Sequence, residues 1–339
     1  MKVLTYAGLP FCLAHGGVTN IARKTTAVLE RLGFDVEPLS WWDDRQNGDI
    51  LFQFCRSDAT IVEYAKLKGL VVVTEQVNSG LVSRARWKRR LQKVFKNCLE
   101  RLAPKMVTEP YGWRGYNMVD MHFVPSPHDA SVISHMFDVP AEKLTVLPYG
   151  VDDEFLHVTK PSVKKEHLIC TATVTERKRV LEVAEAASLA RTPLVVVGKA
   201  YGESDPYSSR FRNVVAESNG IVEHIPHVDG REKLAEMLAG SRGFVLLSTC
   251  ETVSQSALEA AACGCPLLLS DQDWARVAFA NHAHYCPYNL SMAKMATRLR
   301  AFYDACPTLQ QTFPAGSWIE KRSILKPVLT RLVENSRSK

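Results

Sequence analysis

The segment FVLLSTCETVSQSALEAAACGCP, residues 244–266, decides the fold of this chain. Its first four residues are apolar and predict a buried parallel strand. Residues 253–262 are rich in Ala, Leu and Glu and predict a helix, which the Gly-x-Pro turn that follows would end. Glu251 then lies between strand and helix, and Glu259 about two turns along the helix. Ligands of open α/β sheets bind at this carboxyl edge, where helix N-termini suit phosphates.

The spacing of these two glutamates carries a resemblance. Glu251, seven residues, Glu259 and then Ala-Ala-Ala-Cys-Gly-Cys-Pro resemble the E-x7-E signature of retaining GT-B glycosyltransferases of family 4, the glycosyl transferases group 1. Two glutamates alone are common on solvated helices, but the strand before them and the Gly-x-Pro-strand after them make the pattern specific. Residues 144–152, LTVLPYGVD, similarly resemble the family's strand-Pro-Asn-Gly-Val-Asp segment, with Tyr149 in place of Asn.

The resemblance implies an α/β chain of the GT-B type, in which two Rossmann-like, doubly wound domains face a cleft and a C-terminal helix crosses back to the first domain. We expect an acceptor-side domain at residues 1–155, a linker at 156–166, a nucleotide-sugar domain at 167–315 and the returning helix at 316–339. The strand, glycine loop, helix and second strand at the start of the chain fit the opening of a doubly wound sheet.

The same resemblance assigns the donor-binding residues. Glu259 would accept hydrogen bonds from the ribose hydroxyls, and Glu251 would orient the hydroxyls of the donor sugar. Lys178 matches a family Lys that neutralises the diphosphate, whereas Thr173 stands where the family often has Arg. Arg177 is a candidate replacement for that Arg, since a guanidinium can bind a phosphate with two parallel bonds. The alternative for Lys178 is a solvated residue at a helix start.

Backbone groups complete the expected diphosphate site. The amides near Thr252 and Val253 and the loop that contains Gly16 and Gly17 would stabilise charge on the leaving group. Gly16-Gly17 is no complete dinucleotide fingerprint, so a simple tight turn is the other interpretation of this pair.

The acceptor side departs from the family pattern. Family members often carry a His just after the strand predicted at 70–73, and the nearest matches here are Glu75 and Gln76. Two interpretations of Glu75 remain open: a polar or basic group beside the acceptor hydroxyl, or an ordinary loop carboxylate.

A basic helix is predicted from Arg84 to Lys105, a stretch with nine Lys or Arg residues and one Glu. One apolar stripe runs along it: Trp87, Leu91, Val94, Phe95, Cys98 and Leu102. The cations crowd its first half: Arg84, Arg86, Lys88, Arg89, Arg90 and Lys93. Three interpretations compete. The stripe packs on the core and the charges are solvated, the helix lies on an anionic membrane, or it binds nucleic acid or another polyanion. The chain has no recognised nucleic-acid module, so we expect no nucleic-acid partner.

Composition limits the remaining possibilities. The chain has 339 residues, of which 46% are hydrophobic and 23% charged, so it is globular and long enough for two domains. No stretch approaches the roughly 20 apolar residues of a transmembrane helix. Nine cysteines without disulfide-framework spacing fit a reduced cytoplasm, with Cys263 and Cys265 as small core residues. We expect a cytoplasmic protein, with a peripheral position at the inner face of the membrane as an option, and the resemblance implies that it needs no metal and no cofactor.

The expected function is metal-independent transfer of a sugar, with retention, from a nucleotide-diphosphate sugar to a hydroxyl of a glycan, glycolipid or small molecule. Two alternatives remain open. One is a GT-B relative such as a sugar-nucleotide 2-epimerase, which acceptor-free turnover would identify. The other is a catalytically weak protein that binds a sugar nucleotide or a polyanion, which unchanged activity after Glu251→Ala would favour.

Overall fold

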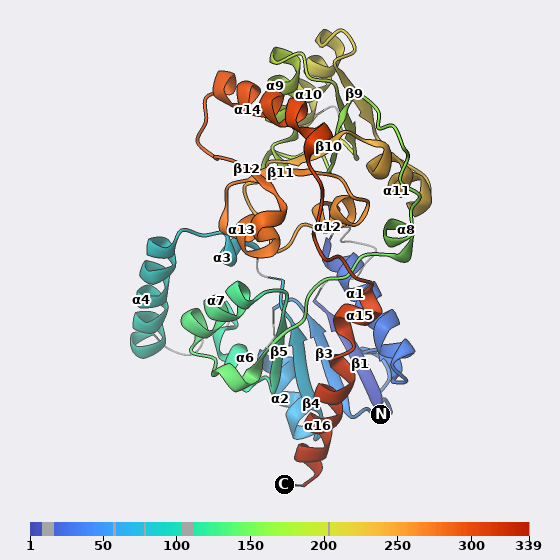
Figure 1. Cartoon of the computed structure of the whole chain (residues 1–339). Coiled ribbons are helices and arrows are strands. Elements are labelled where there is room, and N and C mark those ends of the chain that lie inside the picture. Colours follow the sequence, from blue (N-terminus) through green and yellow to red (C-terminus); the bar gives the residue numbers. More distant parts are fainter. Residues whose placement is uncertain (9–16, 57–58, 78, 104–110, 203, 339) are drawn as a thin grey trace. The chain divides into compact units, whose positions relative to one another are not determined.

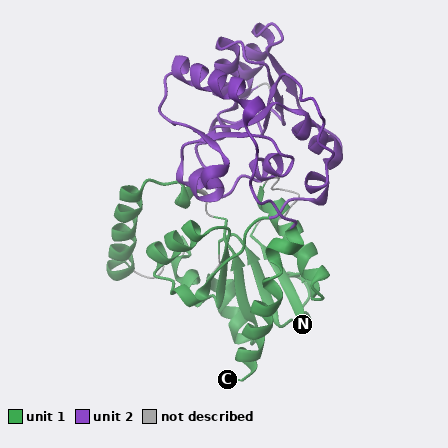
Figure 2. Cartoon of the chain, viewed as in Figure 1, with its two compact units in different colours: residues 1–149, 318–339 green, residues 150–317 purple. Residues whose placement is uncertain are grey.

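The computed structural model describes residues 1–8, 17–56, 59–77, 79–103, 111–202 and 204–338. The chain divides into two compact units (Figure 2). Unit 1 consists of residues 1–149 and 318–339, and unit 2 of residues 150–317. The first unit thus ends six residues earlier than expected, and the segment expected as a linker lies inside unit 2. No helix within the described ranges is both long enough and apolar enough to cross a bilayer.

Unit 1 is built on a parallel six-stranded sheet with the order β2-β1-β3-β4-β5-β6 (Figure 1). Every residue of β3, β4 and β5 is buried, because helices cover both faces of a parallel sheet. This burial explains the continuous apolar runs that mark these strands in the sequence. The strands are β1 (Lys2–Ala7), β2 (Asp35–Pro38), β3 (Ile50–Phe54), β4 (Val71–Glu75), β5 (Met121–Val124) and β6 (Leu144–Val146).

The helices of unit 1 come from both ends of the chain. Those from the N-terminal part are α1 (Gly17–Arg31), α2 (Ala59–Leu67), α3 (Ser79–Val82), α4 (Arg86–Leu102), α6 (Trp113–Met118) and α7 (Pro127–Phe137). The C-terminal segment adds α15 (Trp318–Arg322) against α1 and α16 (Leu325–Arg337) against β4. Residues 39–49, which join β2 to β3 and are all described, contain no helix.

A buried ion pair fastens the C-terminal segment to the sheet of unit 1. Arg322, at the end of α15, donates from Nη2 to Oε1 of Glu75 at 2.7 Å and from Nη1 to Oε2 at 3.1 Å. The hydroxyl of Thr25 on α1 lies 2.7 Å from the same Oε2 and also accepts from Arg322. The guanidinium carbon stands 4.7 Å from the ring centre of Trp318 and 5.6 Å from that of Tyr149. The arginine side chain is fully buried and the glutamate nearly so.

Unit 2 repeats the architecture with a second parallel sheet, ordered β12-β11-β10-β7-β8-β9. Its strands are β7 (Leu168–Thr171), β8 (Leu194–Val197), β9 (Val222–Ile225), β10 (Gly243–Leu246), β11 (Leu267–Ser270) and β12 (His284–Cys286). Its α-helices are α8 (Asp153–Leu156), α9 (Val180–Leu189), α10 (Pro206–Glu217), α11 (Arg231–Gly240), α12 (Gln255–Ala262), α13 (Asp273–Phe279) and α14 (Met292–Ala305). The prediction of two doubly wound α/β sheets is confirmed.

The helix predicted at residues 253–262 begins two residues later than expected. Ser254 is its N-cap, and the hydroxyl of Ser254 accepts from the backbone N–H of Ala257. Glu259 therefore lies about one turn into α12 rather than two. Residues 247–254 form the connection between β10 and the helix, so Glu251 lies within this connection.

Candidate functional site

The strand order of unit 2 contains one switch point, between β7 and β10. From β7 the chain proceeds to β8 and β9 on one side, and then returns to β10, β11 and β12 on the other. The connections leaving β7 and β10 therefore run to opposite sides of the sheet, which opens a crevice at their carboxyl ends. Lys178 follows β7 and Glu251 follows β10, so both belong to this edge.

The structure brings together three of the predicted donor-site residues. Oε1 of Glu251 is 2.5 Å from Nζ of Lys178 and 2.9 Å from Nη1 of Arg177. Glu251 is 8% exposed, and the Lys178 side chain is 15% exposed, whereas half of the Arg177 side chain is open to solvent. Two cations thus share one carboxylate, which leaves the cluster with a formal charge of +1. Such a cluster favours an anion over a neutral ligand.

Backbone contacts hold the two connections against each other. Thr249 donates its N–H to the carbonyl of Arg177 at 2.9 Å, and Arg177 returns a bond from Nη1 to the carbonyl of Cys250 at 2.7 Å. Lys178 lies in a short 3-10 turn at Glu176–Lys178 rather than at the start of α9. These bonds fix the Arg177 and Lys178 backbone next to Glu251.

Glu259 belongs to a second cluster, which contains two residues that the sequence analysis did not single out as site residues. Nη2 of Arg231 lies 3.3 Å from Oε1 of Glu259 and 2.9 Å from Oδ2 of Asp152. Arg231 also donates from Nε to Asp152 at 3.0 Å and stands over the ring of Phe155 at 5.2 Å. Arg231 opens α11 and Asp152 closes the LTVLPYGVD segment. In the sequence, the resemblance of this segment to the family pattern could have pointed to Asp152, and the position of Arg231 after a predicted strand could have pointed to Arg231.

Three predicted backbone contributors have different surroundings. Thr252 is buried in the connection before α12, and Val253 beside it is half-buried. Gly17 is the first residue of α1, and no atom of the described residues lies within 4 Å of the position that a side chain would take there. Gly16 lies outside the described residues.

Thr173, which replaces a family Arg, is exposed just beyond β7. Gly198, at the end of β8, comes so close to that segment that a Cβ would lie 2.1 Å from the carbonyl oxygen of Ala172. A side chain at residue 198 would therefore force the backbone after β7 or β8 to shift, because glycine is what lets the two loops come so close.

The acceptor-side residues of unit 1 are both buried. Glu75 is the last residue of β4 rather than a loop residue, and Arg322 binds both of its carboxylate oxygens. Gln76 donates from Nε2 to the hydroxyl of Thr74 at 3.0 Å and lies 3.1 Å from Nδ1 of His122. Nε2 of His122 is 2.7 Å from the carbonyl of Tyr116. These contacts favour the neutral imidazole, and burial lowers the pKa of His122 to about 4.

The apolar stripe of the basic helix α4 does not pack on the protein core. The stripe faces solvent, and the two buried residues of the helix are Arg89 and Lys96. The interpretation that the stripe packs on the core is therefore wrong. Arg89, expected in the exposed patch, instead faces the protein and donates from Nη1 to the carbonyl of Val82 at 2.7 Å.

The cysteines and histidines give no metal site in the described ranges, where no three His, Cys, Asp or Glu side chains are grouped to hold an ion. Every described cysteine is a free thiol. Burial raises the pKa of Cys263 and of Cys265 to about 12, so both remain neutral core residues.

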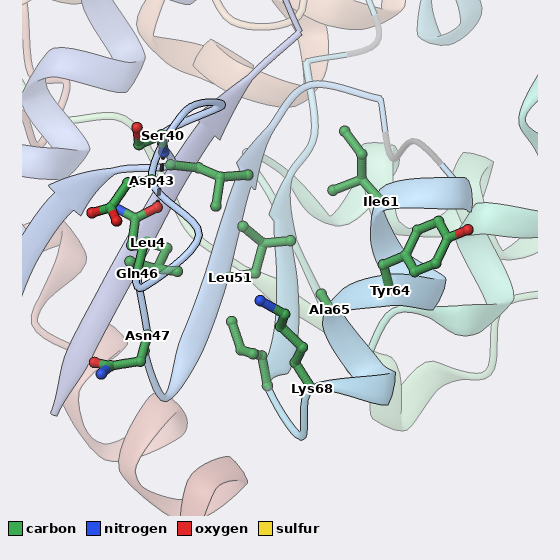
Figure 3. A pocket seen from close by; sticks show the side chains of 13 residues that line it. Leu4, Ser40, Asp43, Gln46, Asn47, Leu51, Ile61, Tyr64, Ala65 and Lys68 are labelled. Carbon is green, nitrogen blue, oxygen red and sulfur yellow. Dashed lines mark hydrogen bonds between the residues drawn. The ribbon is translucent and has the colours of Figure 1, made fainter.

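A cavity of about 460 Å³ lies in unit 1 (Figure 3), and none of the predicted site residues is among the residues that line it. Leu4, Leu51, Ile61 and Ala65 form its apolar wall, and Asp43, Gln46, Tyr64 and Lys68 are among its polar neighbours. Gly48 and Leu70, which precede β3 and β4, place it toward the amino ends of these strands. The helix-free connection 39–49 lines one side of the cavity. It is therefore not at the edge where a doubly wound sheet binds its ligand.

The match to a known protein family falls within unit 2. Residues 152–305 match the family described as "Glycosyl transferases group 1". No curated protein matches the chain by sequence. The glycosyltransferase WaaG, involved in lipopolysaccharide biosynthesis, is 16% identical with a TM-score of 0.59, covering 100% of this chain and 94% of that one.

Two further solved structures are similar over nearly the whole chain. Anabaena HepE in complex with UDP is 12% identical with a TM-score of 0.64, covering 100% of this chain and 99% of that one. Sucrose-phosphate synthase from Thermosynechococcus elongatus is 15% identical with a TM-score of 0.62, covering 99% and 98%. Likeness at these identities establishes the fold. The chain has the GT-B fold, and residues 152–305, within its unit 2, match the model of the glycosyl transferases group 1 family.

Proposed function

We propose that this protein is a glycosyltransferase that moves a sugar from a nucleotide-diphosphate sugar to a hydroxyl, with retention of the anomeric configuration. The observation that carries the proposal is the cluster of Glu251, Arg177 and Lys178 at the switch point of the unit 2 sheet. The family match over 152–305 and the HepE complex with UDP support a nucleotide-sugar donor.

The charges of this cluster suggest how donor binding proceeds. Without donor, Glu251 neutralises one of the two neighbouring cations. A diphosphate carries more negative charge than one carboxylate, so it competes for Lys178 and for the half-exposed Arg177. Glu251 is then free to accept hydrogen bonds from hydroxyls of the donor sugar. In the reaction, the same cations stabilise the charge that develops on the leaving diphosphate.

Glu259 has the complementary task of holding the nucleoside. Arg231 and its second partner Asp152 fix the position of the Glu259 carboxylate, which is almost completely buried. A carboxylate held in this way is preorganised to accept two hydrogen bonds from vicinal hydroxyls of a ribose.

The proton of the acceptor hydroxyl needs a receiver. Arg322 occupies both oxygens of Glu75, so we assign that carboxylate a structural role rather than the role of a base. In the proposed reaction the acceptor oxygen bonds to the anomeric carbon as the bond to the diphosphate breaks. The leaving phosphate oxygen takes the acceptor proton on the same face of the sugar, which requires no metal and no cofactor.

Two further properties belong to the proposal. The acceptor supplies a hydroxyl and is a glycan, a glycolipid or a small molecule. The location is cytoplasmic, which is supported by the free thiols of the described cysteines.

The first test is a thermal-shift screen with UDP, GDP, ADP and their sugar conjugates, without added metal. A nucleotide at 100 times its Kd stabilises the folded protein by about 2.7 kcal/mol. We expect one base to raise the melting temperature, and Glu259→Gln to remove that shift. Glu236→Gln, an exposed glutamate on α11, is the matched control and keeps the shift. No shift with any nucleotide would contradict the proposal and favour a different ligand.

The second test follows the sugar. The selected donor is incubated with a panel of hydroxyl acceptors, and the anomeric configuration of the product is measured by proton NMR. Retention is expected, and an inverted product would refute that part of the mechanism. Acceptor-free release of nucleotide together with an altered sugar would identify the epimerase alternative. Unchanged activity in Glu251→Ala would show that the cluster at the switch point is not the site.

A further inference from the structure

Helix α4 exposes a continuous apolar stripe. Trp87, Leu91, Val94 and Phe95 are each 60–61% exposed, and Leu102 is 85% exposed. Together with the exposed Cys98, these side chains fall at positions i, i+4, i+7, i+8, i+11 and i+15 and so lie on one face of the helix. The stripe is about 22 Å long at 1.5 Å per residue. Single exposed apolar residues are common on proteins, but a contiguous row of five marks an interaction site.

Polar contacts on the opposite face of α4 hold the helix in this orientation. Arg89 donates to the carbonyl of Val82 in α3, and the buried Lys96 pairs with Glu100 at 2.7 Å. Lys93 reaches Asp138 at the end of α7, with Nζ 2.6 Å from Oδ1. Figure 1 shows α4 beside α7 at the margin of unit 1. A rotation that buried the stripe would break the contacts of Arg89 and Lys93 with α3 and α7 and would expose the buried Lys96. The exposure of the stripe is thus built into the packing of the helix.

Cations flank the apolar stripe. Lys88 borders one side and Arg90 and Arg101 the other, and Arg86 lies beyond Arg90 at the start of the helix. All four are exposed. Within α4 and its preceding residues the single acidic group is Glu100, which is paired with Lys96 on the inner face. The surface is therefore apolar in the middle and positive at both margins.

From this arrangement we propose that α4 docks unit 1 on an anionic lipid bilayer. The helix lies in the plane of the surface, the apolar stripe enters the boundary between headgroups and acyl chains, and the flanking cations contact lipid phosphates. The pattern matches the physical requirements of an interfacial helix, namely a large amphipathicity, Trp and Phe on the apolar face and Lys and Arg at its edges. A nucleic acid would use the cations but leave the five apolar side chains in water, so the lipid surface accounts for more of the observations.

The test is flotation of the full chain with vesicles, which requires no sugar transfer and is independent of the proposed function. The vesicles contain phosphatidylcholine with about 30 mol% phosphatidylglycerol, or phosphatidylcholine alone, at physiological salt. We expect strong binding to the anionic vesicles only. Each cation near such a surface contributes about fivefold, so Arg86→Ser with Lys88→Ser and Arg90→Ser weakens binding about 100-fold. Lys233→Ser with Lys294→Ser and Lys326→Ser removes the same charge from exposed sites elsewhere and leaves binding unchanged.

A second pair of variants tests the apolar stripe. Trp87→Ser with Phe95→Ser weakens binding roughly tenfold or more, since two aromatic side chains no longer leave water. Trp42→Ser with Leu67→Ser alters two residues that are even more exposed, at 96% and 77%, but lie outside α4, and binding persists. In Trp87→Phe, binding is kept while quenching of tryptophan fluorescence by brominated lipid decreases. The proposal is overturned if the intact chain does not float, if both charge variants lose binding equally, or if the stripe variant binds like the intact chain.

Discussion

Replacing Arg322 by Met removes one partner of the buried ion pair in unit 1, and we expect a large loss of stability. Glu75 would keep its charge within a site where it is 1% exposed, with the hydroxyl of Thr25 as the remaining partner among the contacts described above. Water cannot compensate for the lost guanidinium there. Breaking a buried pair from one side costs about 3–5 kcal/mol, because the other charge stays desolvated.

The structure allows the expected magnitude to be compared with that of an exposed pair. Arg337 also joins the C-terminal segment to the first strands, with Nη2 2.6 Å from Oδ1 of Asp49, but its side chain is 68% exposed. Arg337→Met should cost about 0–1 kcal/mol. For a unit of this size, the loss at Arg322 corresponds to a decrease in Tm of roughly 6–20 °C, against a few degrees for Arg337.

Differential scanning calorimetry of the intact chain and the two variants measures this difference. The double variant Glu75→Gln with Arg322→Met should be more stable than Arg322→Met alone, since it removes the isolated charge. The reasoning is refuted if Arg322→Met is no more destabilising than Arg337→Met, or if the double variant is the least stable of the set.

Three other predictions concern the site and the two sheets. Lys178→Met should lower kcat/KM for sugar transfer by about 10²–10³, and Arg177→Met by about tenfold because solvent reaches that side chain; steady-state kinetics giving the opposite order would contradict the assignment. Gly198→Ala should cost about 1–3 kcal/mol of unit 2 stability, since its Cβ meets the Ala172 carbonyl at 2.1 Å. The control Gly202→Ala, where no atom of the described residues lies within 4 Å of the added Cβ, should change the free energy of unfolding in urea by less than about 0.5 kcal/mol. Burial lowers the pKa of His122 to about 4, below the 6.5 of the unfolded chain. The unfolded state therefore binds the proton first, and the free energy of unfolding should decrease by up to about 3 kcal/mol as pH falls from 6.5 to 4. Thermal melts of His122→Gln should lack this slope, and NMR titration of His122 near pH 6.5 would disprove it.

Much of the fold was accessible from the sequence, because both sheets are parallel and buried. Apolar runs such as residues 70–73 and 244–247 predict buried strands. Because helices are predicted between successive strands, the strands are expected to be parallel, as in a doubly wound sheet. The nearness of Lys178 and Glu251 was also predictable, since both follow strands that meet at the edge where such sheets bind ligands. The resemblance to a known family added their roles, which remain proposals.

Other features depend on contacts between distant elements. Periodicity reveals that α4 has an apolar side but not which side faces the protein, and the bonds of Arg89 and Lys93 to α3 and α7 decide this. The partners of Glu259 and Glu75 likewise come from other helices, Arg231 from α11 and Arg322 from α15. No local pattern around either glutamate specifies these arginines.

The ion pair between Glu75 and Arg322 also has a consequence for the order of folding during synthesis. The two residues are 247 positions apart, and all of unit 2 is translated between them. At 5–20 residues per second, the ribosome needs roughly 12–50 s to pass from one to the other. Unit 2 is continuous in sequence, and Val151 pairs with Ser317 near its two ends. Unit 2 can therefore complete its sheet before Arg322, which neutralises Glu75 at the end of β4, has been synthesised. The part of the chain that emerges first is thus the part that finishes last, and a nascent chain stalled before residue 322 would contain a folded unit 2 and an incomplete unit 1.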